Sequence, residues 1–287
     1  MTTYLTLTRE ERPGMGIATV RSGIPRLNGM RLQTTELKRG AARSEDDLVG
    51  CELPIGAEFE PAPVSSETKR DCIMVAGASG CGKTYYCAMY IRNYQAANRD
   101  APVYVVSKVK TDPVLDEIEP KLRRLEMECV TQSPPLTADD FGRCLVLFDD
   151  VDTFTGKEEA SVRNLMDCLL TTGRHSGTSI MVATHHLTNY SRTRLLLNEC
   201  NWYVVFPQAT AHAPLAYLLR TYFGLTSDAV SKLRLPRIGR WVALHKNSPQ
   251  ILLTSSYAKL LNPPEEEGGN IEEPREELSA LDGAGRV

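Results

Sequence analysis

The chain has 287 residues, of which 42% are hydrophobic, and a formal net charge of −3. This size and apolar content suit one large domain with its own core, or one domain with appendages. The small negative charge excludes a surface coated with basic residues. A local basic surface in a ring or pore is still compatible with it, because the position of charges matters more than their sum.

Eight cysteines are spread along the chain without a Cys-x-x-Cys pair or a histidine at zinc-ligand spacing. Several fall in apolar runs, which indicates buried thiols and a reducing, intracellular compartment. Apolar runs of about 18 residues, long enough to span a membrane, are absent, so no membrane span is predicted. The first residues also lack the basic-then-apolar order of a secretory signal.

Residues 1–67 are rich in turn-forming residues and charges. Residues 1–44 carry eight basic and three acidic side chains, a net charge of +5. We interpret this segment as an N-terminal arm or extension. It is either an extended arm that touches DNA or a neighbouring subunit, or a loosely packed leader with a solvated charge pattern.

Residues 77–84 match G-x-x-x-x-G-K-[ST], the P-loop that binds a nucleoside triphosphate. The glycines allow a tight turn that brings backbone N–H groups to the phosphates. Lys83 is expected on the β- and γ-phosphates and the Thr84 hydroxyl on Mg²⁺. The predicted nucleotide-binding residues are Gly77, Ala78, Ser79, Gly80, Cys81, Gly82, Lys83 and Thr84.

The surroundings of the motif predict an α/β fold. A short apolar run at 72–76 enters the loop, and residues 84–98 read as the helix that leaves it. Apolar runs at 103–107, 144–148, 178–184 and 202–206 predict four further strands, and apolar spacing predicts an amphipathic helix at 161–172. Strands that alternate with helices indicate a parallel sheet covered on both faces.

Two segments at 239–245 and 251–254 predict a C-terminal β-pair, so the P-loop ATPase domain is placed at 68–257. Residues 258–287 are then a tail. Its part from 263 onward carries eight acidic and two basic residues, a net charge of −6, which is typical of a disordered acidic segment.

Two carboxylates follow the third predicted strand. Asp149 ends the apolar run and is expected to hold Mg²⁺, with Thr84, through water. Asp150 occupies the position from which a carboxylate activates the attacking water in hydrolytic motors. Glutamate is commoner in that role, and Asp152 is a nearby alternative.

The fourth strand ends in Thr184-His185-His186, and Thr184 and His185 are candidates for a polar sensor of the γ-phosphate. Arg174, at the junction before this strand, is a candidate arginine finger that reaches the nucleotide of a neighbouring subunit. Arg192 and Arg194 are alternatives, and like Lys108 and Lys110 they are also possible DNA contacts.

Four segments carry a family resemblance: GASGCGKT, LVLFDDVDTF, LLTTGRHSGTSIMVATHH and GRWVALHKNSP. Together they resemble the poxvirus-type genome-packaging ATPases of large eukaryotic DNA viruses, which belong to the FtsK–HerA group of P-loop motors. The resemblance spans roughly residues 70–257. It implies a mostly parallel sheet of the ASCE type in the order 5-1-4-3-2.

The family also implies ATP and Mg²⁺ as cofactors and a homo-oligomeric ring, a pentamer or hexamer. It implies double-stranded DNA and a capsid or portal-vertex protein as partners. The expected location is the virus factory, in the host cytoplasm or nucleus, or the virion. In this family's terms Asp150 is the base and Arg174 the finger in trans. The chain departs from the wider group at the sensor, where relatives often carry glutamine and this chain has Thr184-His185-His186.

Other readings of the same motifs are a cellular-type FtsK/HerA-like translocase or helicase, a small-molecule P-loop kinase, and a scaffold that binds nucleotide without hydrolysing it. The Asp149-Asp150 pair favours water as the acceptor over a kinase substrate, and no arginine-rich lid segment is recognisable.

Overall fold

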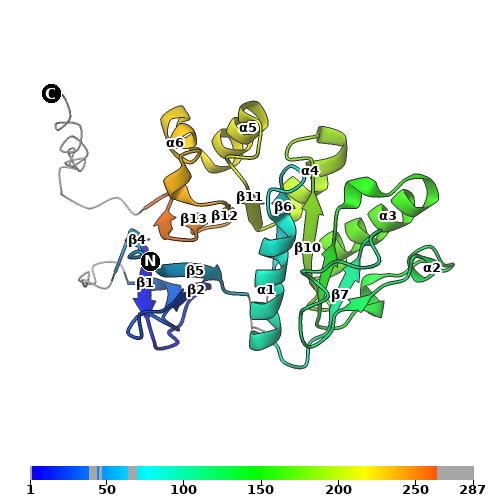
Figure 1. Ribbon diagram of the computed structural model, residues 1–287, viewed down its shortest axis with the longest axis horizontal. Helices are drawn as coiled ribbons and strands as arrows, with labels where there is room; N and C mark the ends of the chain where they lie inside the picture. The colour runs from blue at the N-terminus through cyan, green and yellow to red at the C-terminus, as the bar shows by residue number, and fades with distance from the viewer. Residues whose placement is uncertain (1, 39–43, 45–46, 64–69, 264–287) are drawn as a thin grey trace.

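The computed structural model describes residues 2–38, 44, 47–63 and 70–263. Its centre is a ten-stranded sheet in the order β4-β14-β13-β12-β11-β6-β10-β9-β7-β8 (Figure 1). The parallel part consists of β6 (Cys72–Ala76), β7 (Val103–Val106), β8 (Arg123–Arg124), β9 (Leu145–Phe148), β10 (Ser179–Thr184) and β11 (Trp202–Val205).

The five strands predicted from the sequence are β6, β7, β9, β10 and β11, in chain order. Their order in the sheet is β11-β6-β10-β9-β7, which is 5-1-4-3-2. The predicted α/β class and strand order are therefore confirmed. Strand β10 lies between β6, which leads into the P-loop, and β9, which ends at Asp149.

Alternate residues of β6 point to opposite faces of the sheet. Ile73 and Val75 belong to the core formed with α1, whereas Met74 and Ala76 belong to the core formed with α3, α4, α5 and α6. The helices are α1 (Lys83–Ala97), α2 (Met127–Val130), α3 (Gly156–Thr172), α4 (Tyr190–Glu199), α5 (His212–Phe223) and α6 (Ser227–Lys232). Short 3₁₀ turns are η1 (Ala138–Asp140), η2 (Val151–Thr153) and η3 (Pro236–Ile238).

Helix α3 confirms the amphipathic prediction. Its buried residues are Val162, Leu165, Met166, Leu169 and Leu170, the same five positions that the spacing selects. The helix begins earlier than predicted, at Gly156, because Glu158 and Glu159 in its first turn suit a helix N-terminus and carry no apolar signal.

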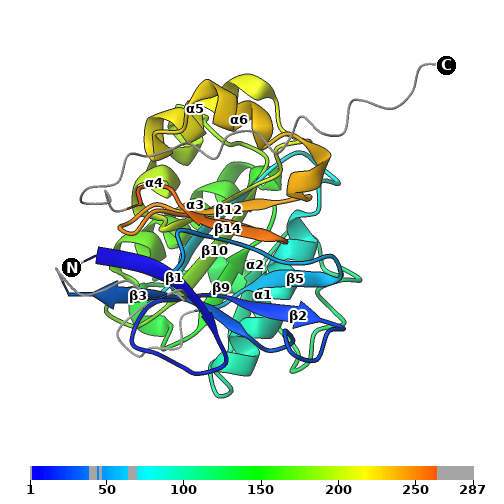
Figure 2. The same ribbon diagram turned by 90° about the vertical axis from the view of Figure 1, so that its left-hand side faces the viewer.

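The N-terminal segment is not an extended arm, so that expectation was wrong. Strands β1 (Thr2–Thr8), β2 (Gly16–Ser22), β3 (Arg31–Leu37) and β5 (Ala57–Pro61) form an antiparallel sheet in the order β1-β3-β2-β5. Figure 2 shows this sheet in front of the strands of the main sheet. Strands β1, β2 and β3 bury runs of adjacent residues that include Thr6, Gln33 and Thr34, so their sequences lack the clean alternation that would mark them as strands.

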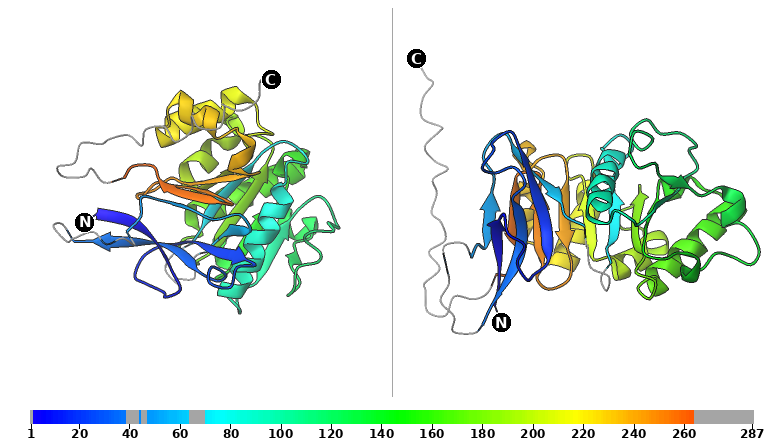
Figure 3. Two further views of the ribbon diagram at one scale, coloured as in Figure 1. Left: turned by 60° about the vertical axis from the view of Figure 1, so that its left-hand side comes forward. Right: turned by 90° about the horizontal axis from the view of Figure 1, so that it is seen from below.

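The N-terminal sheet packs on the same face of the main sheet as α1. Leu5, Ile17, Leu32 and Phe59 share one buried cluster with the α1 side of the main sheet. Figure 3 shows the blue N-terminal strands beside the orange C-terminal strands, far from α3. Strand β4 (Gly50–Glu52) lies between β3 and β5 in the sequence but belongs to the main sheet, where it pairs with β14 (Tyr257–Leu260) at the edge.

The predicted C-terminal β-pair is present as β12 (Val242–His245) and β13 (Ile251–Thr254), antiparallel to each other. Strand β14 extends the pair to Leu260, so the sheet continues past the predicted boundary at 257. The acidic tail at 264–287 lies outside the described residues. Within the described part of the chain, no helix has the length and apolar character needed to cross a membrane.

Candidate nucleotide site

The P-loop lies at the carboxyl ends of β6 and β10. The Gly77 N–H donates to the Thr184 carbonyl oxygen at 3.1 Å, which ties the loop to the end of β10. Gly77 has no room for a side chain, because a Cβ there would lie 2.7 Å from the Cys81 sulfur and 2.9 Å from the Phe206 ring. Gly82 has φ of 111°, a left-handed conformation that glycine adopts without strain.

Lys83 is the first residue of α1, and its side chain is 6% exposed. Its ammonium group donates to the carbonyl oxygens of Gly77 at 3.2 Å and Ala78 at 3.4 Å. It also lies 3.3 Å from Nδ1 of His185 and 3.5 Å from Oδ1 of Asp150. The lysine is therefore held within the concave side of the loop, where a phosphate would meet it.

Asp149 is 7% exposed at the end of β9 and accepts a hydrogen bond from the Ser107 hydroxyl at 3.2 Å. Burial raises the pKa of this carboxyl to about 6, and the neighbouring Asp150 charge adds to the rise. A cation beside Asp149 would favour its charged form.

The donor set fits Mg²⁺ held by a nucleotide. Mg²⁺ is commonly bound by one or two protein oxygens together with phosphates and water. Asp149 and Thr84 supply such oxygens, and among the residues with a described structure no group of three His, Cys, Asp or Glu side chains forms an all-protein metal site.

Asp150 has a left-handed backbone, with φ of 46°, and is the non-glycine residue with positive φ in the described ranges. Such a conformation is costly for most residues and tolerated by aspartate. Its Oδ1 atom lies 3.5 Å from Lys83 Nζ and 3.4 Å from His185 Nε2. This buried oxygen accepts no hydrogen bond from the described residues. It therefore keeps an unused acceptor position beside the two charged partners.

His185 lies between Lys83 and Asp150. Because the lysine ammonium can only donate, its contact with Nδ1 assigns the ring proton to Nε2, which faces Asp150. The predicted sensor candidate is thus brought together with the P-loop lysine and the candidate base.

Thr184, the other sensor candidate, and Asp152, the alternative base, are hydrogen-bonded to each other. The Oδ2 atom of Asp152 accepts hydrogen bonds from the Thr184 hydroxyl and from the His185 N–H, both at 2.7 Å. These bonds fix the turn after β10. The Thr184 hydroxyl is therefore engaged with Asp152, and Asp152 also holds the backbone of His185.

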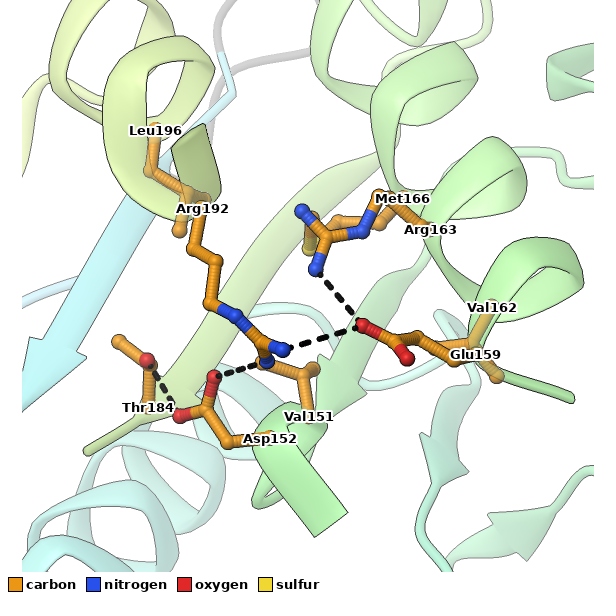
Figure 4. Close-up of a pocket in the computed structure, with 9 residues that line it drawn as sticks. All are labelled: Val151, Asp152, Glu159, Val162, Arg163, Met166, Thr184, Arg192 and Leu196. Atoms are coloured by element: carbon orange, nitrogen blue, oxygen red, sulfur yellow. Dashed lines mark hydrogen bonds and ion pairs between the residues drawn. The ribbon is translucent and has the colours of Figure 1, made fainter. Parts of the chain in front are cut away.

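Arg192 belongs to a charge network behind this turn (Figure 4). Its guanidinium lies 3.7 Å from Asp152 Oδ1 and 3.5 Å from Glu159 Oε1, and Arg163 lies 3.2 Å from the same Glu159 oxygen. The network links α4 and α3 to η2. Arg192 is thus already paired within its own chain.

Arg174 lies elsewhere. It is exposed, precedes β10, and has its Nε atom 3.4 Å from His175 Nε2. The six residues of β10 span about 20 Å at the usual rise of a strand. Arg174 therefore lies near the amino-terminal ends of the parallel strands, whereas the P-loop of its own chain lies at their carboxyl ends. Of the other candidate cations, Lys108 donates to the Thr153 carbonyl at 3.2 Å.

Sequence reasoning missed the side chains that flank the P-loop on its other side. A Cβ on Gly82 would lie 3.1 Å from Cδ of Arg240 and 3.6 Å from the Phe206 ring, so both side chains lie against the loop. The one sequence signal for them is the Gly-Arg-Trp run before β12, which is part of the family resemblance. Burial also raises the pKa of the Cys81 thiol inside the loop, which keeps it protonated.

Comparison with known proteins adds a relative from a virus. The chain is 30% identical over 228 residues to a Sputnik virophage protein described as "Uncharacterized protein V3", which covers 78% of this chain and 90% of that protein. The chain belongs to the V3 family. A search against protein-family models gave no match.

Three solved structures illustrate the similarity of fold. The genome packaging NTPase B204 of Sulfolobus turreted icosahedral virus 2 matches 65% of the V3-family chain and 97% of its own, with 14% identity and a TM-score of 0.44. The pCW3 conjugation coupling protein TcpA covers 86% and 77%, with 10% identity and a TM-score of 0.47. The type VII secretion ATPase EccC of Thermomonospora curvata covers 81% and 31%, with 12% identity and a TM-score of 0.46. The functional argument for this V3-family protein therefore rests on its own site.

Proposed function

We propose that this chain is an ATP-hydrolysing motor that moves viral double-stranded DNA into a capsid. The observation that carries the hydrolytic part is the cluster of Lys83, Asp150 and His185, whose side chains lie within 3.5 Å of one another at the P-loop. A carboxylate beside the P-loop lysine, with no acceptor-binding lid recognisable in the sequence, suits transfer of a phosphoryl group to water.

In this proposal the nucleotide is ATP with Mg²⁺. The P-loop backbone and Lys83 bind the phosphates, and Thr84 and Asp149 hold the metal. Asp150 accepts the proton of the attacking water, and His185 reports on the γ-phosphate. Asp152 keeps His185 in place through its bond to the backbone N–H.

The DNA-packaging part rests on the virophage origin of the relative and on the family resemblance of the motifs. It includes a homo-oligomeric ring on double-stranded DNA, a capsid or portal-vertex partner, and a location in the virus factory or virion. A cellular-type FtsK/HerA-like translocase would use the same site and differs in its setting.

The test is steady-state ATP hydrolysis by purified protein with and without long double-stranded DNA. We expect hydrolysis that DNA stimulates. Lys83→Ala and Asp150→Asn should each lower the rate at least a hundredfold, whereas Arg99→Ala, an exposed arginine after α1, should keep it. Wild-type protein that fails to hydrolyse ATP would contradict the enzyme assignment. Hydrolysis that is indifferent to DNA would contradict the motor.

The proposal also assigns Arg174 as the finger in trans. Arg174 lies at the end of the strands that is far from its own P-loop, so in this proposal it acts only on the nucleotide of a neighbouring subunit. Arg174→Ala and Lys83→Ala should both be inactive alone. A mixture should recover part of the activity, because a Lys83→Ala subunit supplies an intact Arg174 to a neighbour with an intact P-loop. A mixture with no recovery, or an active Arg174→Ala protein, would reject this assignment.

A further inference from the structure

A large cavity lies beside the P-loop, on the side away from the candidate base. It has a volume of about 670 Å³, within the usual range for small-molecule sites. Its walls come from α1, the N-terminal sheet and the loop before β12. The side chains that matter are those of Tyr85, Arg92, Arg240, Trp241 and Arg21, and the cavity reaches Gly82 of the P-loop itself.

The order of the strands explains why this cavity suits the far end of a nucleotide. Asp149 and Asp150 follow β9, on one side of β6, whereas Phe206 follows β11 and Arg240 precedes β12, on the other side. A triphosphate whose terminal phosphate lies near Asp150 and Lys83 extends along the P-loop toward Gly82. The sugar and base then continue on the β11–β12 side, where the cavity opens.

The chemistry of the walls fits a nucleoside. The Tyr85 side chain, on the first turn of α1, is 66% exposed although it lines a cavity, which leaves an aromatic face free for stacking. Behind it Trp241 is 9% exposed and meets Tyr86 edge-on, with ring centroids 5.1 Å apart, which makes a rigid floor.

The cavity is also positively charged where it meets the loop. The Nη1 atom of Arg240 would be 3.6 Å from a Cβ on Gly82, and Arg240 and Arg92 form no ion pair with any carboxylate of the described residues. A guanidinium that has no carboxylate partner among the described residues, and that lies against a glycine of the P-loop, suits a phosphate oxygen.

The N-terminal sheet closes the outer wall. Arg21 on β2 forms ion pairs with Glu58 and Glu60 on β5, each at 3.0 Å. A ligand in the cavity would touch both this sheet and the ATPase sheet.

We propose that this cavity binds the nucleoside half of the P-loop nucleotide, with Tyr85 stacked on the base and Arg240 on the phosphate nearest the sugar. The N-terminal sheet thereby becomes part of the nucleotide site. This inference rests on the proposed nucleotide-binding function and adds to it the residues that recognise the nucleoside.

Calorimetric titration separates the two halves of the ligand. A non-hydrolysable ATP analogue carries triphosphate and nucleoside, whereas inorganic tripolyphosphate carries the phosphates alone. With Mg²⁺ present, Tyr85→Ala should weaken the analogue roughly ten- to a hundredfold and leave tripolyphosphate within about twofold of wild type. Arg240→Ala should also weaken the analogue. Tyr217→Ala, which removes an exposed tyrosine from α5, is the matched control and should change neither.

The same titrations distinguish the possible failures. Lys83→Ala should lose both ligands. Wild-type protein that binds neither ligand would overturn the nucleotide-binding function and this inference with it. If wild-type protein binds the analogue and the Tyr85→Ala and Arg240→Ala variants bind it equally tightly, this inference is overturned and the proposed function stays intact.

Tryptophan fluorescence gives a second readout. The chain has two tryptophans, of which Trp241 lines the cavity and Trp202, at the start of β11, contacts His245. In a Trp202→Phe background the ATP analogue should change the Trp241 emission and tripolyphosphate should not. An equal response to both ligands, or no response to the analogue, would place the nucleoside outside the cavity.

Discussion

Asp149 carries a carboxyl group that is buried beside a second carboxyl group. Its carboxyl lies at the end of β9, where it accepts a hydrogen bond from the Ser107 hydroxyl and has Asp150 as a like-charged neighbour. Burial raises the pKa to about 6, so at neutral pH the protein without ligand holds a charge that it stabilises poorly. A bound cation would remove this conflict.

The raised pKa predicts how stability depends on pH. The folded protein binds a proton at Asp149 more tightly than the unfolded chain does, so this contribution to stability is present near pH 4 and lost as the pH rises through 6. Asp149→Asn should therefore raise the Tm of the ligand-free protein at pH 7 to 8 and change it little near pH 4. The gain has an upper limit of roughly 3 kcal/mol.

Thermal unfolding of both proteins between pH 4 and pH 8, without nucleotide or divalent metal, measures this difference. Asp228→Asn is the control, because Asp228 is exposed and its ion-pair partner among the described residues is Lys232, one turn away, so the substitution should have a small effect. An Asp149→Asn protein that is less stable than wild type at pH 8 would contradict the prediction.

At this scale the sequence predicts which residues lie at the site better than how they point. The P-loop and the carboxylates after β9 follow from residue order, because parallel strands bring their carboxyl ends to one edge of the sheet. The directions of these side chains depend on the left-handed backbone of Asp150 and on the hydrogen bonds of Asp152 to the Thr184 hydroxyl and the His185 N–H. Local sequence does not encode either.

Helix α3 ends against a cation from the start of β6. The Arg70 guanidinium donates to the carbonyl oxygens of Leu169 and Leu170, both at 2.6 Å. The Leu169 carbonyl also accepts the N–H of the C-cap residue Gly173, and Leu170 lies in the last turn, where carbonyls lack partners inside the helix. A cation there also suits the helix dipole. Gly173 makes the contact possible, because a Cβ there would lie 2.6 Å from Nη1 of Arg70.

We expect Arg70→Ala to lower the free energy of unfolding by about 1.5–3 kcal/mol, the usual range for hydrogen bonds to a charged group. Arg70→Lys should restore part of it, because one ammonium can serve only part of the two-armed contact. Urea denaturation measures the change, with Arg99→Ala as an exposed control. A change below about 0.5 kcal/mol for Arg70→Ala would mean that the contact contributes little.

Helices and strands with a clear pattern of apolar residues are predicted from the sequence. Short strands that form only by pairing with a distant strand are not. The five predicted strands are largely apolar along their whole length, and α3 has an apolar face. Strand β4 has only Gly50–Glu52 and exists because β14 offers a free edge, and β8 has two residues against β7. Short strands that gain their identity from a distant partner leave little trace in the local pattern.

The N-terminal sheet and the main sheet share one hydrophobic core. The buried cluster on the α1 face contains residues of both sheets, among them Phe59 of β5 with Tyr86 of α1 and Leu253 of β13. Strand β4 also pairs with β14, which joins the two sheets by backbone hydrogen bonds. A shared core predicts that both sheets unfold in a single cooperative transition.

Phe59→Ala tests this. Phe59 is 1% exposed, so its removal should cost about 3–5 kcal/mol and lower the Tm of the whole chain by on the order of 10 °C. Differential scanning calorimetry should show one peak in the variant, as in wild type, shifted downward. Phe154→Ala, in the core on the other face of the main sheet, should shift the same single peak. A separate early transition in Phe59→Ala, with the main peak unmoved, would mean that the N-terminal sheet folds independently. In that case the N-terminal sheet would not form a stable wall of the cavity, because Arg21 would lose its position while Tyr85 and Arg240 remain ordered.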